Sequence, residues 1–190
     1  MNTNGKIGVA ANRLVCFLLG AAATLVASSS GAETLQPSGG DDYATIQAAI
    51  DNVGSWGKVS LAQGTWKISK ALAVTNGVTL VGETGDPEDV RITTTAKDVA
   101  FATVKGGTVS GIAFHGAWGT QKPALSLLAG GVATNCIVRS CEVTGGGNDA
   151  CAVTLNGADA LMTHCVVSNN VNSAGPGNGM ARACGGVHVE

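Results

Sequence analysis

Gly107-Thr-Val-Ser-Gly-Ile-Ala-Phe-His115 is the stretch that decides the fold, because the chain repeats its pattern twice. The second copy is Gly131-Val-Ala-Thr-Asn-Cys-Ile-Val-Arg139, and the third is Ala160-Leu-Met-Thr-His-Cys-Val-Val-Ser168. Alignment of the copies gives three columns, which hold Gly111, Asn135 and His164; Ile112, Cys136 and Cys165; and Phe114, Val138 and Val167. Equivalent residues lie 24 and then 29 positions apart.

A repeat of this length is typical of solenoids, in which each unit stacks on its neighbour. Each copy has apolar residues two positions apart in runs rich in Val, Thr and Ile, which is the pattern of β-strands. A weaker repeat joins Ala124–Leu128, Cys151–Leu155 and Gly186–Val189. No helical pattern intervenes, and a propeller blade would need about 40 residues. The sequence therefore predicts an all-β chain wound as a parallel coil that climbs one strand spacing, roughly 4.8 Å, per repeat.

In such a coil the apolar columns face inward, and the polar column of His115, Arg139 and Ser168 faces outward. Gly-Gly pairs at 106–107, 130–131 and 185–186 suit corners that need a positive φ. Upstream, strands are expected at Lys58–Leu61, Thr65–Ile68, Leu72–Val74, Val78–Val81 and Val90–Thr94, with turns at Gly64, Asn76-Gly77 and 83–89.

Residues 41–54 predict one short amphipathic helix after a polar lead-in at 33–40. Asp41 or Asp42 can cap its N-terminus, and Gly54 ends it. One face carries Ile46, Ala49, Ile50 and Val53. Because the first coil of a solenoid has an open apolar end and an unpaired edge, we interpret this helix as its cap.

Residues 1–32 have the pattern of a secretory signal peptide: a basic start with Lys6 and Arg13, an apolar core and a small-residue cleavage site at Ser30-Gly31-Ala32. The alternative is an uncleaved membrane anchor, but the apolar run is shorter than the roughly 20 residues of a span. We expect a secreted, periplasmic or cell-surface protein with no membrane span after cleavage. Without Lys6 and Arg13 the 11 basic residues fall to 9 against 13 acidic ones, a net charge of −4. This balance disfavours nucleic acid as a partner.

Five cysteines follow the signal segment, namely Cys136, Cys141, Cys151, Cys165 and Cys184. Cys136 and Cys165 would lie about one strand spacing apart on adjacent coils, which is within reach of a disulfide. The simpler interpretation, which we favour, is that both are small core residues in a ladder. The disulfide state of the five cysteines stays open, and none has metal-site spacing.

Three segments, 42–51, Val59-Ser-Leu-Ala-Gln-Gly-Thr-Trp66 and Gly77-Val-Thr-Leu-Val-Gly82, resemble the N-terminal segment of right-handed parallel β-helix proteins of the pectin-lyase-like superfamily. This superfamily includes pectinesterases, polygalacturonases and polysaccharide lyases. Ala62-Gln63 stands where many members have a proline. The resemblance implies a domain from residue 33 to 190, with a cap at 41–54 and coils from about 58. Where members are catalytic, it also implies a polysaccharide groove on the outer face of one sheet.

The catalytic residues that the resemblance implies, such as paired Asp on neighbouring strands, are not evident. Asp149 and Asp159 are expected in turns, and Arg139 and Glu142 could form a surface ion pair. Structural roles are expected for His115, His164 and His188. Trp56, Trp66 and Trp118 could stack on sugars or cover a coil edge. No catalytic residue is assigned, and whether the protein is an enzyme stays open.

No cofactor or metal is expected, although the acidic stretch 83–89 offers clustered oxygens that could hold calcium. The chain stops inside a strand-like run, Gly186–Glu190, from which we expect an incomplete β-helix whose active coils lie elsewhere. We expect an exported protein that acts on or binds polysaccharide, most plausibly a pectin-like uronate glycan. The alternative is a non-enzymatic surface or adhesin-like β-helix.

Overall fold

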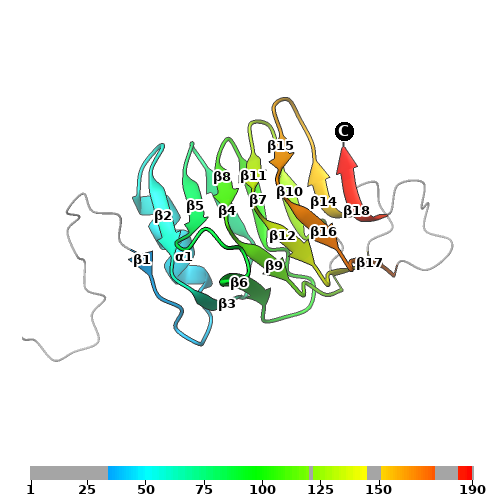
Figure 1. Cartoon of the computed structure of the whole chain (residues 1–190), viewed down its shortest axis with the longest axis horizontal. Coiled ribbons are helices and arrows are strands. Elements are labelled where there is room, and N and C mark those ends of the chain that lie inside the picture. Colours follow the sequence, from blue (N-terminus) through cyan, green and yellow to red (C-terminus); the bar gives the residue numbers. More distant parts are fainter. Residues whose placement is uncertain (1–33, 120–121, 145–150, 174–183, 190) are drawn as a thin grey trace, which may run out of the picture. The chain divides into compact units, whose positions relative to one another are not determined.

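The computed structural model describes residues 34–119, 122–144, 151–173 and 184–189. The chain divides into two units, Met1–Gly31 and Ala32–Glu190, and every described residue belongs to the second. The described residues of this unit form a parallel β-solenoid with one short helix near its start (Figure 1). The predicted signal segment 1–32 and the predicted turn at Asp149 lie outside the described residues.

Three long sheets form the sides of the coil, and every strand pairing is parallel. The first sheet has the order β1 (Thr34–Leu35), β2 (Lys58–Leu61), β5 (Thr79–Gly82), β8 (Thr108–Ser110), β11 (Val132–Thr134) and β15 (Leu161–Thr163). The second has β3 (Gly64–Ile68), β6 (Val90–Thr94), β9 (Ala113–His115), β12 (Ile137–Arg139) and β16 (Val166–Ser168). The third has β4 (Leu72–Thr75), β7 (Ala102–Lys105), β10 (Leu125–Leu127), β14 (Cys151–Leu155) and β18 (Cys184–Val189). A short pair joins β13 (Glu142–Val143) to β17 (Val171–Asn172).

The register of the strands confirms the repeat alignment. Thr134 is opposite both Ser110 and Thr163, and Val138 is opposite both Phe114 and Val167. Phe114 is fully buried, with its ring centroid 5.4 Å from that of Phe101. The apolar columns therefore stack inward as expected, since residues two dozen positions apart become neighbours.

The corner between the first and second sheets explains the first column of the repeat. Gly111, Asn135 and His164 have φ values of 63°, 50° and 53°, so each turns the chain through the left-handed region. The pairs at 106–107 and 130–131 also mark a corner, with φ of 60° at Gly106 and 68° at Gly130. The prediction for 185–186 is wrong, because this pair lies inside β18. There Val187 pairs with Val153 of β14 and continues the ladder.

The predicted helix is α1 (Tyr43–Asn52), whose Ile46 and Ile50 are buried. Gly54 follows with a φ of 78°, as expected for a helix stop. The prediction that Val53 shares the buried face is wrong, since this residue lies beyond the helix end and is exposed. Asp42 occupies the N-cap position without a capping bond from its side chain. Asp41 makes that bond instead, and its Oδ1 accepts from the N–H of Tyr43 at 3.1 Å.

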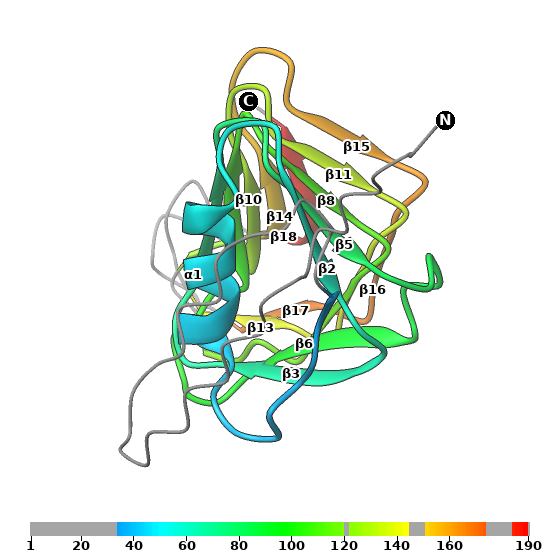
Figure 2. The ribbon, with the colours of Figure 1, turned by 90° about the vertical axis from the view of Figure 1, so that its left-hand side faces the viewer.

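The start of the chain covers the first edge of each long sheet. β1, which the sequence suggested only as a polar lead-in, pairs with β2. Asp41 forms a β-bridge with Lys67 of β3. The amide of Gln47 on α1 exchanges two hydrogen bonds with the backbone of Ala73 on β4, at 2.9 and 3.2 Å. Figure 2 shows α1 beside the coil on the side of the third sheet. These contacts satisfy backbone groups that an edge strand would leave unpaired, so the cap interpretation fits the structure.

The strands farthest from α1 carry exposed apolar side chains, in particular Leu161, Val166, Val171 and Val189. Across the described ranges, no helix is both long and apolar enough to cross a membrane.

Candidate functional site

The outer face of the second sheet carries a row of polar and charged side chains that could bind a ligand. Strand alternation turns Trp66, Ile92, Phe114 and Val138 inward, where they are buried. The next residue on each strand therefore points outward. The register places these residues in one row that runs Lys67, Thr93, His115, Arg139 and Ser168. We call this surface, together with Arg91 and Glu88 beside it, the cationic face.

A bidentate ion pair spans the middle of the cationic face. The Nη1 and Nη2 atoms of Arg139 donate to the two carboxylate oxygens of Glu88 at 2.6 and 2.7 Å. Glu88 lies just before β6 and Arg139 lies on β12, so the pair reaches across β9, which separates these strands. Such fork-to-carboxylate pairs are geometrically specific. Both side chains keep substantial solvent exposure, 27% for Arg139 and 42% for Glu88, so the pair contributes little to stability.

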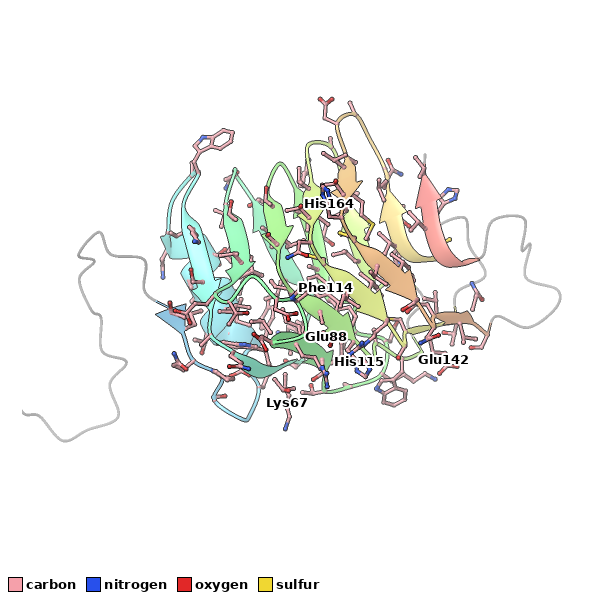
Figure 3. All side chains as sticks on the ribbon, in the orientation of Figure 1. Lys67, Glu88, Phe114, His115, Glu142 and His164 are labelled. Atoms are coloured by element: carbon pink, nitrogen blue, oxygen red, sulfur yellow. The ribbon has the colours of Figure 1, made fainter. Side chains whose placement is uncertain are left out.

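Arg91 and His115 complete this arrangement. Arg91 lies 3.6 Å from Glu88, and its Nε atom is buried without a hydrogen-bond partner. Burial, together with the positive charges of Arg91 and Arg139, holds the pKa of His115 below its usual value, while Glu88 acts in the opposite direction. The imidazole is therefore neutral near pH 7. Figure 3 shows Lys67, Glu88 and His115 on the same side of the coil.

The acidic stretch 83–89 forms the loop that carries Glu88. Asp86 accepts the N–H of Glu88 at 2.9 Å, and Asp89 accepts from Gln63 at 3.0 Å. Glu83 accepts from Thr34 at 3.2 Å. Within the described ranges, no group of three or more acidic, His or Cys side chains could hold a metal ion. The loop carboxylates are instead occupied by hydrogen bonds and by Arg139.

The three tryptophans have different environments. Trp66 is fully buried and donates from Nε1 to the carbonyl of Ala62 at 3.1 Å, so it belongs to the core and cannot stack on a ligand. Trp56 is 84% exposed at a corner with a φ of 65°. Trp118 is 47% exposed and lies three residues after His115, past the corner at Gly116, which has a φ of 79°.

The predicted ion pair between Arg139 and Glu142 is wrong. Arg139 pairs with Glu88, which is 51 residues away, and Glu142 accepts from the hydroxyl of Ser173 at 2.7 Å. Glu142 is close to Arg139 in the sequence, but the corner at Ser140, which has a φ of 55°, turns the chain between the two residues.

The remaining candidates lie away from the cationic face. Asp159 has a φ of 61° and occupies a corner, as expected. His164 is exposed at its corner, with Nδ1 2.9 Å from the hydroxyl of Thr163. His188 lies on β18 opposite Thr154, in the third sheet. Of the three histidines that the sequence singled out, only His115 therefore lies among the charged side chains of the candidate site.

The cysteines differ in state. Cys136, Cys141 and Cys165 are free thiols. Cys136 and Cys165 lie on adjacent coils, as expected, but only Cys136 is a buried core residue, because Cys165 is partly exposed. Cys151 is disulfide-bonded, and its register partner on β18 is Cys184. Burial raises the pKa of Cys141 to about 11, so this thiol is unreactive.

Sequence reasoning did not single out Lys67, Glu88 or Arg91. Alternation within the predicted strands 65–68 and 90–94 could have placed Lys67 and Arg91 outward. The position of Glu88 depends on how the loop at 83–89 folds back, which no repeat pattern records. Comparisons with protein-family models, with curated proteins and with solved structures find no match to this chain.

Proposed function

We propose that this chain is an exported β-helix protein of the pectin-lyase-like type that binds an acidic polysaccharide of the uronate class along the cationic face. The observation that carries the proposal is the placement of Lys67, Arg91 and Arg139 on the outer face of one sheet of a chain that is otherwise slightly acidic. Guanidinium groups match carboxylates in bidentate geometry, and a local positive field attracts an anionic polymer.

Glu88 has a defined role in this proposal. It occupies the fork of Arg139 in the unbound protein, and the exposed pair is weak enough for a ligand carboxylate to replace it. The guanidinium of Arg91, whose Nη2 atom lies 3.6 Å from Glu88 and whose side chain is 38% exposed, adds a second positive charge close by.

The test is calorimetric titration of the protein with oligogalacturonate, and with a neutral oligosaccharide as the ligand control. Arg91→Gln and Arg139→Gln should each weaken binding by roughly 10-fold or more, since a charged hydrogen bond contributes about 1.5–3 kcal/mol. Glu88→Gln should strengthen binding, because it removes the competing carboxylate. Lys105→Gln, an exposed substitution on β7 of another sheet, should change nothing. Equal binding by all four variants would contradict the proposed surface.

A non-enzymatic surface protein is the second candidate, and one observation favours binding without catalysis. Glu88 is the one carboxylate among the residues of the cationic face, and Glu142, which lies past the corner at Ser140, accepts a hydrogen bond from Ser173. A pair of free carboxylates is what glycoside hydrolysis requires. Incubation with pectate, alginate and related uronates separates the two cases. New reducing ends or unsaturated sugar ends would identify an enzyme, whereas binding without either product would identify the surface protein.

A further inference from the structure

Cys136 and Cys165 form a closely matched pair of thiols at the corner between the first and second sheets. The flanking residues are in register, with Thr134 opposite Thr163 and Ile137 opposite Val166. The backbone N–H of Cys136 donates to the Sγ of Cys165 at 3.3 Å. Adjacent strands lie about 4.8 Å apart, which is inside the Cα separation that a disulfide accepts. A bond between these two sulfurs therefore needs little movement of the coils.

The two thiols have opposite chemical character. Cys136 is 1% exposed, and its Sγ lies 3.3 Å from the carbonyl oxygen of Thr134 and 3.6 Å from that of Val109. Its pKa is raised because the thiol hydrogen bonds to Cys165 and because the side chain is buried. Cys165 is only partly buried. The hydrogen bonds that it accepts from the Cys136 side chain and backbone N–H lower its pKa to about 7.

This asymmetry is what thiol–disulfide exchange requires. The attacking sulfur must be a solvent-accessible thiolate, and the resolving sulfur must be a protonated thiol within bonding reach. Cys165 meets the first requirement and Cys136 meets the second. Cys141, the other free thiol of the described residues, meets neither, because it is buried with no cysteine hydrogen-bonded to it in the structure.

We propose that Cys136 and Cys165 are a thiol–disulfide exchange site that takes small-molecule disulfides. The Cys165 thiolate attacks one sulfur of the disulfide, forms a mixed disulfide and releases the first small thiolate. The Cys136 sulfur then attacks the Sγ of Cys165 and expels the second small thiolate, which takes up the Cys136 proton. Two protein thiols are oxidised to one disulfide, and one small disulfide is reduced to two thiols. The pair uses none of the residues of the cationic face, so this inference does not depend on the proposed function.

The experiment starts from the full chain with Cys136 and Cys165 as thiols and treats it with oxidised glutathione. Digestion by trypsin and an endoproteinase specific for Asp and Glu then cuts after Arg139, Glu142 and Asp159, which places Cys136, Cys141 and Cys165 on separate peptides. Mass spectrometry should find one peptide pair joined through Cys136 and Cys165. Absence of this pair after prolonged treatment, or a pair joined through Cys141 instead, would overturn the proposal.

Variants identify the two roles. Cys136→Ser should stop the reaction at a stable glutathione adduct on Cys165, and Cys165→Ser should leave Cys136 unmodified. Cys141→Ser is the matched control and should cross-link as the parent does. In the unmodified chain, which needs no variant to fold, iodoacetamide at about pH 7 should alkylate Cys165 at least roughly tenfold faster than Cys141. Equal alkylation rates, or an adduct on Cys136 in the Cys165→Ser chain, would count against the assignment.

Discussion

Gly131 illustrates how single residues allow the coils to approach one another. An added Cβ would lie 2.2 Å from the carbonyl oxygen of Val104 on the preceding coil, which is far inside contact distance. Gly116 differs, because an added Cβ would meet nothing within 4 Å but the backbone has a φ of 79°. One glycine is thus required by space and the other by conformation.

We therefore expect Gly131→Ala to destabilise the protein clearly more than Gly116→Ala. The second substitution costs roughly 1–2 kcal/mol through the left-handed φ alone. Gly131→Ala has no such φ cost, but its Cβ must push two backbone segments apart. Urea unfolding followed by circular dichroism measures both changes, and a Gly131→Ala chain as stable as the Gly116→Ala chain would show that the coils separate easily.

His115 permits a prediction about pH at the same scale. Its pKa is lowered by burial and by Arg91 and Arg139, so the unfolded chain binds a proton more readily than the folded one. This residue consequently favours the folded state fully above the unfolded pKa of about 6.5, and that contribution falls as the pH drops below it. Arg139→Gln should raise the pKa of His115, since it removes a positive charge and frees Glu88.

Imidazole resonances followed by NMR during a pH titration give this pKa directly. Lys67→Gln is the matched control, because Lys67 lies in the same outward row but two strands away, and it should shift the pKa of His115 less. An unchanged or lower pKa in the Arg139→Gln chain would be inconsistent with the ion-pair geometry of the cationic face.

At the scale of elements, α1 acts as a substitute for a missing strand. Gln47 imitates a peptide group, since its amide both donates to and accepts from the backbone of Ala73 on the edge strand β4. Asp42 performs a similar task for β3. Its carboxylate accepts from the N–H and hydroxyl of Ser38 at 2.8 and 2.6 Å, and from the N–H of Lys67 at 3.1 Å.

Gln47→Ala should lower the free energy of unfolding by about 1–2 kcal/mol, because two exposed hydrogen bonds to the backbone are lost. Gln63→Ala is the control, since Gln63 makes one exposed bond, to Asp89, and should cost less. Chemical denaturation with both chains compares the two losses. If Gln47→Ala unfolds at the same denaturant concentration as Gln63→Ala, the helix does not protect the sheet edge.

Asp42→Ala should cost more, about 2–4 kcal/mol, because the substitution removes a buried carboxylate that accepts three partly buried hydrogen bonds. Asp51→Ala removes a carboxylate from the same segment that accepts one exposed bond, from Gln47. The melting temperatures of the two variants measure the difference. Similar melting temperatures would mean that water replaces the Asp42 carboxylate at little cost.

At the scale of the whole solenoid, each coil contacts mainly its neighbours, so stability varies along the stack. Strands in the middle of the stack, such as β8 and β9, pair with a neighbouring strand along both of their edges. Val166 of β16 and Val171 of β17 are more than half exposed. Hydrogen exchange should therefore be slowest in β8 and β9 and fastest in β16 and β17. Uniform protection would instead indicate a single cooperative unit.

The sequence predicted the coil well and the candidate site poorly, for one physical reason. Apolar residues two positions apart and repeated columns record the strand register directly, so Phe114, Val138 and Val167 align from the residue pattern alone. Contacts on the outer face depend on loops, which the repeat does not constrain. Arg139 has Glu142 three residues away in sequence, yet the corner at Ser140 and the fold of the 83–89 loop give it Glu88 instead.

The loop at 83–89 also ties together coils that do not touch through their strands. Besides the Arg139–Glu88 pair, Asn135 donates to the carbonyl of Gly85 at 2.6 Å, and both contacts bypass the strands β8 and β9. A plain stack pulled at its two ends would peel away one turn after another. Here the bypassed turn is clamped between two others, so under mechanical load these three should yield in a single rupture.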